Sequence, residues 1–227
     1  MRGKFFNGYV GWIVLINVIA FLIATILGFF SNLNCLETIC KYVALQPGAF
    51  LNGHFWTLLT SMFMHGGVMH LFVNMLSLVF VGGFVERLIG SRRFLILYLG
   101  SGLFAGLFHS ILTYFLGSSV VGSFAMRFIG NPNGFAVGAS GAIFALIGLL
   151  VLVIPNLKVY AMFIPIPIKM KYAGPGFLIL FWLLSYYSPL SVGNLAHLGG
   201  LLVGLGYGGY LKYKYPRKTA MIARKFS

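Results

Sequence analysis

The chain has 227 residues, of which 59% are hydrophobic and only 8% are charged, and its mean hydropathy is +0.95. Soluble globular domains carry about 25% charged residues, so this composition excludes a soluble domain and indicates a membrane protein with several spans. The formal net charge of +14 would suggest a nucleic-acid partner in a soluble protein. Here the positions of the charges explain it better, and we expect no nucleic-acid partner.

Apolar segments close to the roughly 20 residues that span a bilayer recur along the chain. We expect an all-α polytopic membrane protein with six transmembrane helices, in a single domain over residues 1–227. The helices are predicted at about 8–30, 67–85, 94–116, 140–155, 175–187 and 192–210, and a basic tail follows at 211–227. The first apolar run is too long for a signal-peptide core, so we expect a retained helix.

Lysine and arginine gather on one side of this predicted bundle. Only Lys41 and Arg127 fall in segments assigned to the other side. Because basic loops stay in the cytoplasm, both termini are predicted to be cytoplasmic, in a multi-pass protein of the cell membrane. The tail after Tyr210 is basic enough to contact anionic lipid headgroups.

The connecting loops differ in character. The first external loop, 31–64, is aromatic rather than charged and is expected to lie in the membrane interface. Its cysteines, Cys35 and Cys40, are equally compatible with a disulfide and with free thiols. The internal loop before the fifth helix contains an Ile-Pro-Ile-Pro-Ile run, which is predicted to be extended because proline constrains its neighbours.

The fourth helix is predicted to be short. It begins near Ser140 and stops at Pro155. About sixteen residues, at about 1.5 Å each, cover about 24 Å of a hydrocarbon core that is about 30 Å thick. The external end of this helix is therefore expected to lie below the membrane surface, with Ser140 inside the membrane.

Ser140 belongs to the stretch Gly138-Ala139-Ser140-Gly141, which opens this helix. A serine between glycines at a helix start suggests a nucleophile. Small residues are also common where membrane helices pack closely, so the tetrapeptide alone leaves both interpretations open.

Several other polar residues fall within predicted spans or at their ends. Such residues are costly in a membrane and indicate function; the candidates are His65, His70, His109, His197 and Asn74. His70 and Asn74 are four residues apart and project from one helix face. The second, fourth and sixth helices all run inward from the external side, so their polar groups are predicted to meet at one depth.

Acidic residues are nearly absent. The chain has no aspartate and only two glutamates, Glu37 and Glu86. This excludes a Ser-His-Asp triad and nearly excludes carboxylate proton relays and metal cages. We expect no metal and no cofactor.

The fourth and sixth predicted helices carry small residues at helical spacing. The small positions are Gly141, Ala145 and Gly148 in one and Ala196, Gly200, Gly204 and Gly208 in the other. Small residues let two backbones approach closely. Packing these two helices together would bring His197 to Ser140.

Four ordered motifs make the chain resemble the rhomboid family of intramembrane serine proteases. They are His65 with His70-x-x-x-Asn74, Gly-Gly-Phe-Val-Glu-Arg at 82–87, Gly138-Ala139-Ser140-Gly141, and Ala196-His197-x-x-Gly200. The resemblance spans about residues 56–208 and keeps the motifs in family order. It implies a six-helix bundle that cleaves transmembrane protein substrates in the lipid bilayer.

The resemblance also implies a role for each matching residue. Ser140 would be the nucleophile and His197 the general base, and the oxyanion hole would consist of His70, Asn74 and the Ser140 backbone N–H. Phe144, at a position where many relatives have tyrosine, would stack on His197 and orient it. Structural support would come from His65, Glu86, Gly138, Gly141 and Gly200.

Two further features do not follow the family pattern. His109 matches no family site and is interpreted as a buried, hydrogen-bonded histidine. The Trp-Arg pair that some relatives carry in the first external loop is absent.

Two other functions compete with the protease. One is a non-catalytic rhomboid-like protein that binds transmembrane clients, and retention of Ser140 and His197 counts against it. The other is a transporter or channel with a histidine proton path, against which the scarcity of carboxylates and the lack of inverted repeats count.

Overall fold

The structure is a computed structural model that describes residues 8–30, 41–119, 128–160, 166–187 and 193–226. Four residues discussed above lie outside these ranges: Cys35, Glu37, Cys40 and Arg127. The described chain is mostly helical, and the long helical units follow one another in the predicted order. A small β-ribbon between the fourth and fifth of these units departs from the all-α expectation.

Among the described residues, six long helical units form the bundle. They are α1 (Tyr9–Phe30), the continuous run of α5 (Val68–Ser77), the π-helix η3 (Leu78–Gly82) and α6 (Gly83–Ile89), then α7 (Ser91–Ser119), α9 (Ser140–Val153), α10 (Met170–Tyr187) and α11 (Asn194–Lys214). Three stretches are long and apolar enough to cross a membrane: Tyr9–Gly28, Val68–Ile89 and Ser91–Gly117. The helix α9 is apolar and shorter.

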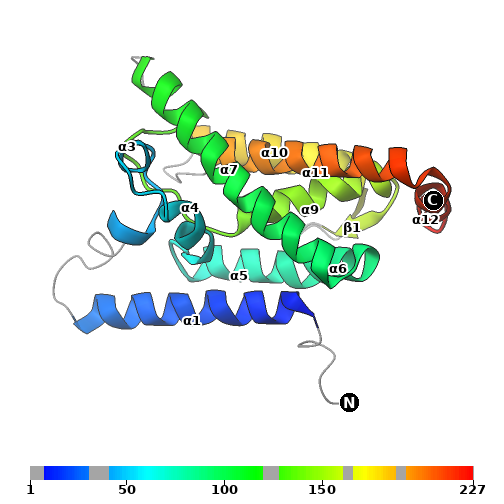
Figure 1. Ribbon diagram of the computed structural model, residues 1–227, viewed down its shortest axis with the longest axis horizontal. Helices are drawn as coiled ribbons and strands as arrows, with labels where there is room; N and C mark the ends of the chain where they lie inside the picture. The colour runs from blue at the N-terminus through cyan, green and yellow to red at the C-terminus, as the bar shows by residue number, and fades with distance from the viewer. Residues whose placement is uncertain (1–7, 31–40, 120–127, 161–165, 188–192, 227) are drawn as a thin grey trace.

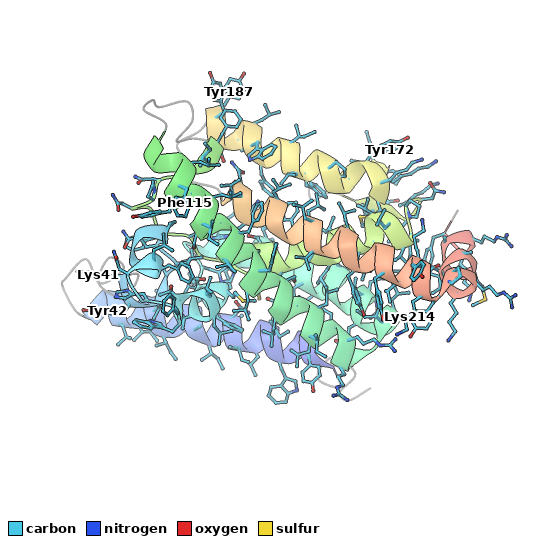
Figure 2. All side chains as sticks on the ribbon, turned by 45° about the horizontal axis from the view of Figure 1, so that its top comes forward. Lys41, Tyr42, Phe115, Tyr172, Tyr187 and Lys214 are labelled. Carbon is cyan, nitrogen blue, oxygen red and sulfur yellow. The ribbon has the colours of Figure 1, made fainter. Side chains whose placement is uncertain are left out.

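Shorter elements lie at the two ends of the bundle. The segment before α5 contains α3 (Pro47–Leu51), α4 (Thr57–Thr60) and the 3₁₀-helix η2 (Ser61–Phe63). The opposite end carries β1 (Lys158–Tyr160), β2 (Pro167–Lys169) and α12 (Pro216–Arg224) (Figure 1). Figure 2 shows the same division, with Lys41 and Tyr42 at one end and Tyr172 and Lys214 at the other.

The helix α9 is the centre of the bundle (Figure 1). Every residue from Gly141 to Leu150 is buried, because neighbouring helices surround this uniformly apolar segment. With 14 residues it is about 21 Å long at about 1.5 Å per residue. It ends at Val153, two residues before the predicted end at 155, because Pro155 cannot continue a helix.

The closest helix contact joins α9 to α11 through glycines. A β-carbon added to Gly200 would overlap the carbonyl oxygen of Gly141, and one added to Gly204 would overlap that of Ala145. From the other side, a β-carbon on Gly148 would lie 2.5 Å from the carbonyl oxygen of Leu201. The two backbones are therefore in direct contact along the predicted small-residue stripes.

Glu86 joins α6 to the start of α1. Its buried carboxylate accepts hydrogen bonds from the backbone N–H groups of Tyr9 at 2.7 Å and Val10 at 3.2 Å. These N–H groups open a helix and have no partner within it, and the positive end of the helix dipole favours the carboxylate. Glu86 thus anchors α1.

The ends of several helices differ from the predicted ranges. The second unit runs to Ile89 rather than 85 and stops at Gly90, which has a φ of +86°. The helix α7 covers 91–119 instead of 94–116. The sixth unit extends to Lys214 rather than 210. Within the predicted tail at 211–227, residues Pro216–Arg224 form the additional helix α12.

The fifth unit, α10, begins at Met170 rather than at the predicted 175. Backbone hydrogen bonds from Met170 to Leu157 and from Lys171 to Pro155 fix its start. Pro175 lies inside the helix, in its second turn, where it cannot donate a hydrogen bond to the carbonyl of Lys171 and its ring crowds that carbonyl.

We expect Gly204→Ala to destabilise the bundle by about 1–3 kcal/mol, because the added methyl group meets the carbonyl oxygen of Ala145. Gly206→Ala is the matched control, since nothing lies within 4 Å of that added carbon. It should leave stability unchanged or raise it by up to about 1 kcal/mol, because alanine favours helix over glycine. Unfolding of the detergent-solubilised variants, followed by circular dichroism, measures the difference. Equal stability of the two variants would contradict the backbone contact.

Candidate active site

Ser140 and His197 lie within hydrogen-bonding distance. Ser140 is the first residue of α9, and His197 lies in the first turn of α11. The Ser140 Oγ and the His197 Nε2 are 2.7 Å apart. His197 is buried and Ser140 is half-buried.

The His197 ring packs against two phenylalanine rings, which also contact each other at a centroid distance of 5.9 Å. Phe144, one turn after Ser140, stacks on it with a centroid distance of 4.5 Å and an interplanar angle of 17°. Phe181 of α10 packs at 5.3 Å and 50°. The His197 Nδ1 is buried and has no hydrogen-bond partner among the described residues. Ring packing, rather than a carboxylate, therefore sets the orientation of this imidazole.

Gly138 brings the His70 ring close to Ser140. Its φ of +123° is a conformation that glycine adopts without strain. A β-carbon at Gly138 would lie 2.9 Å from the Cε1 and Nε2 of His70 and 3.8 Å from the Ser140 Oγ. The Gly138 N–H donates to the carbonyl of Ser61 at 2.9 Å, which fixes the backbone segment before α9. Only glycine leaves room for the ring here.

The His70 ring has a defined hydrogen-bond pattern. The backbone N–H of Gly66 donates to its Nδ1 at 3.4 Å, so Nδ1 acts as an acceptor. In a neutral imidazole the other nitrogen then carries the proton. The Nε2–H of His70 is therefore a donor on the side of Gly138.

Asn74 lies one turn after His70, and its described hydrogen bond stays within α5. The side-chain amide donates to the His70 carbonyl at 2.9 Å, and the residue is buried. The structure thus brings Asn74 beside His70 but records no hydrogen bond from it to Ser140.

His65 supports His70 from behind. It is buried, and the two rings meet edge to face at 5.1 Å. Burial, followed by the nearby His70, lowers the pKa of His65 to about 4. His65 is therefore neutral at physiological pH and acts by packing.

Gly141 and His109 occupy structural positions near the site. A β-carbon on Gly141 would lie 2.8 Å from that of Ala105, so this glycine lets α7 approach α9. His109 is buried in α7, and its Nδ1 lies 3.3 Å from the Oγ1 of Thr113, which donates to the Ile129 carbonyl. His109 therefore helps to join α7 to the segment before Gly138.

Three contributors were not predicted from the sequence: Phe181, Ser61 and the pair Asn194–Ser185. The Asn194 amide donates to the Ser185 hydroxyl at 2.9 Å and ties the start of α11 to α10. Phe181 is one of 23 phenylalanines, and nothing in its spacing distinguishes it. For the bond between Asn194 and Ser185, the available signal in the sequence was an asparagine at the start of a predicted membrane helix.

No metal site accompanies these residues in the part of the chain that the structure describes. Within those ranges, histidine, cysteine, aspartate and glutamate form no group of three or more that could hold an ion. The chemistry available at the site is that of a hydroxyl, two imidazoles and backbone N–H groups.

Known proteins similar to this chain include named proteases and one relative named inactive. Rhomboid protease GluP of Bacillus subtilis is 32% identical over 171 residues, which are 74% of this chain and 28% of that protein. RHOMBOID-like protein 1 of Arabidopsis thaliana is 31% identical over 186 residues, 78% and 41% of the two chains. Inactive RHOMBOID-like protein 8 of the same plant is 35% identical over 97 residues, 43% and 22%. The chain covers less than half the length of each.

The sequence model of the Rhomboid domain matches residues 52–214. This range begins just before α4 and ends with α11, so it includes every residue of the site described above. The chain is a membrane protein and belongs to the rhomboid family.

Proposed function

We propose that this protein is a serine endopeptidase that cleaves transmembrane segments of membrane proteins within the bilayer. The observation that carries the proposal is the 2.7 Å distance between the Ser140 Oγ and the His197 Nε2. Relatives named as rhomboid proteases support the same reaction class.

The proposed topology has six spans, with both termini on the cytoplasmic side of the cell membrane. The start of α1 and the helix α12 lie at the same end of the bundle (Figure 1). Basic residues of β1, β2 and α12 gather at that end, as the positive-inside rule requires. Ser140 then lies in the external half of the membrane, and we infer that water reaches this half-buried residue from outside.

In the proposed reaction, His197 acts first as a base. Its Nε2 accepts the proton of the Ser140 hydroxyl while the Oγ attacks the carbonyl carbon of the scissile peptide bond. The resulting imidazolium gives this proton to the leaving amine as the C–N bond breaks. Water, deprotonated by His197, then attacks the acyl-enzyme and releases the carboxylate product and free Ser140.

The imidazolium formed in this cycle has no carboxylate beside it. Glu86, the only acid among the described residues, is engaged at the start of α1. The face of Phe144 lies against the ring instead, and Phe181 packs beside it at a tilt of 50°; an aromatic face attracts a cation. We infer that these rings both orient His197 and stabilise its charged form.

The oxyanion of the tetrahedral intermediate is assigned to donors near Gly138. The Nε2–H of His70 points to this region, and the Ser140 N–H opens α9 beside it. Asn74 acts with them by holding the carbonyl of His70, and its remaining amide hydrogen is available as a donor. Each such donor is worth about 3–4 kcal/mol in related chemistry.

Substrates are proposed to be single-span proteins. Their helices must unwind locally, since a helical amide is inaccessible to attack, and family resemblance favours small residues at the cleavage site. A non-catalytic protein that binds transmembrane clients is the alternative, because one relative is named inactive.

Ser140→Ala and His197→Ala should each lower cleavage of a model single-span substrate by about 10³-fold or more in proteoliposomes, because each removes one half of the dyad. Ser77→Ala, at the half-exposed end of α5, is the control and should keep full activity. Undiminished cleavage by Ser140→Ala would exclude it as the nucleophile. An inactive wild-type protein that still binds the substrate would favour the alternative function.

Phe144→Leu should lower kcat by about tenfold, because it removes the aromatic face from the His197 imidazolium. Phe144→Tyr keeps that face and should retain kcat. Substrate binding does not depend on this ring, so KM should change little in either variant. A parallel change in kcat and KM, or equal loss in both variants, would argue against the stacking role.

His70→Ala should lower kcat by about 10²-fold, because it removes a donor to the oxyanion. Its thermal stability should remain close to that of the wild type, since the ring is only half-buried. His65→Ala is the matched control, because this neighbouring ring touches His70 but not Gly138. Its effect on kcat should be smaller. Loss of stability in proportion to activity would recast His70 as structural.

A further inference from the structure

Two lysines face each other across the β-ribbon at the basic end of the bundle. In the antiparallel pairing of β1 and β2, Lys158 lies directly opposite Lys169. Like charges at directly opposed positions destabilise a two-stranded ribbon. The backbone bond from Met170 to the Leu157 carbonyl, at 2.8 Å, holds the two strands in this register. The repulsion is therefore built into the fold.

The same two lysines line a surface cavity of about 520 Å³. Its other lining residues are Asn156, Leu157 and Phe226. Phe226 follows α12 and packs edge to face on Phe84 at 5.6 Å, which fixes the far wall. The volume lies within the range of about 300–1,000 Å³ that is typical of small-molecule sites.

Nothing acidic among the described side chains neutralises this cavity. Glu86 is the only acid within those ranges, and its carboxylate already binds the start of α1. The exposed residues Lys171 and Arg224, close in sequence to Lys169 and Phe226, add further positive charge. The cavity is thus suited to an anion.

Exposed apolar side chains lie on the ribbon and next to it in the chain. Tyr160 is 70% exposed, Ile166 66% and Tyr172 63%, and all three belong to or adjoin the ribbon. Figure 2 shows Tyr172 at the outer edge of this end of the bundle. Aromatic side chains of this kind favour the boundary between headgroups and acyl chains. A soluble anion would use the lysines alone, whereas a phospholipid uses both the charges and the apolar rim.

We propose that the cavity between the β-ribbon and α12 binds the headgroup phosphate of an anionic phospholipid from the surrounding bilayer. Lys158 and Lys169 contact the phosphate, and Tyr160, Ile166 and Tyr172 contact the glycerol and upper acyl region. The proposal rests on the membrane topology proposed above and not on the chemistry of Ser140.

Lipid retention tests the site. The wild-type protein and the double variant Lys158→Gln/Lys169→Gln are purified in neutral detergent, mixed with phosphatidylglycerol or phosphatidylcholine, and examined by native mass spectrometry. The variant should bind phosphatidylglycerol at least about tenfold more weakly, because both lysines that attract the anionic headgroup lose their charge. Phosphatidylcholine binding should be equal in the two proteins.

The double variant Lys212→Gln/Lys218→Gln is the matched control, since it loses the same charge from the same end but outside the cavity. It should keep most of the phosphatidylglycerol binding. Equal loss in both double variants would overturn the proposal in favour of diffuse charge attraction. Displacement of the lipid by millimolar inorganic phosphate would also overturn it, because the site would then bind free phosphate.

Thermal unfolding of the same proteins shows whether the variant remains folded. In neutral detergent without anionic lipid, Lys158→Gln/Lys169→Gln should unfold at the same temperature as the wild type or a higher one, because the cross-strand repulsion is gone. Added phosphatidylglycerol should raise the unfolding temperature of the wild type and not of this variant. Equal rises would contradict the assignment of the cavity.

Discussion

The direct backbone contact between α9 and α11 determines the geometry of the candidate site. In a lipid environment apolar side chains gain little by leaving their surroundings, so helices associate through close packing. Gly200 against Gly141 and Gly204 against Ala145 allow that packing over about one helical turn. Ser140 and His197 each lie near the start of these helices, so the contact fixes their separation. A larger residue in the stripe would separate the two side chains as well as the helices.

The same contact explains how a histidine can be positioned without an acid. The His197 ring contacts Phe144 on α9 and Phe181 on α10. The glycines of α11 bring its backbone against that of α9, and α10 makes fewer contacts of this kind. The hydrogen bond between Asn194 and Ser185 therefore helps to hold α10 in place. Positioning of the imidazole thus depends on three helices and on shape rather than on one hydrogen bond.

Residue types and helix periodicity predicted most of this arrangement, but not its details. The lack of aspartate in the chain excluded a Ser-His-Asp triad. The four-residue spacing of small residues predicted the contact of α9 with α11. The contribution of Phe181 was not predictable, since no spacing rule links α10 to His197. The start of α10 and the β-ribbon depend on bonds from Met170 and Lys171 to residues 155 and 157. Hydropathy cannot detect such bonds, so the helix ends differ most from prediction.

The length of α9 connects the two ends of the molecule. At about 21 Å, this central helix is about 9 Å shorter than a hydrocarbon core of about 30 Å. In the proposed topology the difference must be taken up at its two ends. At the external end it leaves Ser140 below the surface but half-exposed, where water and an unwound substrate can meet. At the internal end the chain leaves α9 at Val153 and enters the ribbon at Lys158. The short central helix therefore links the recessed Ser140 to the ribbon that carries the proposed lipid site.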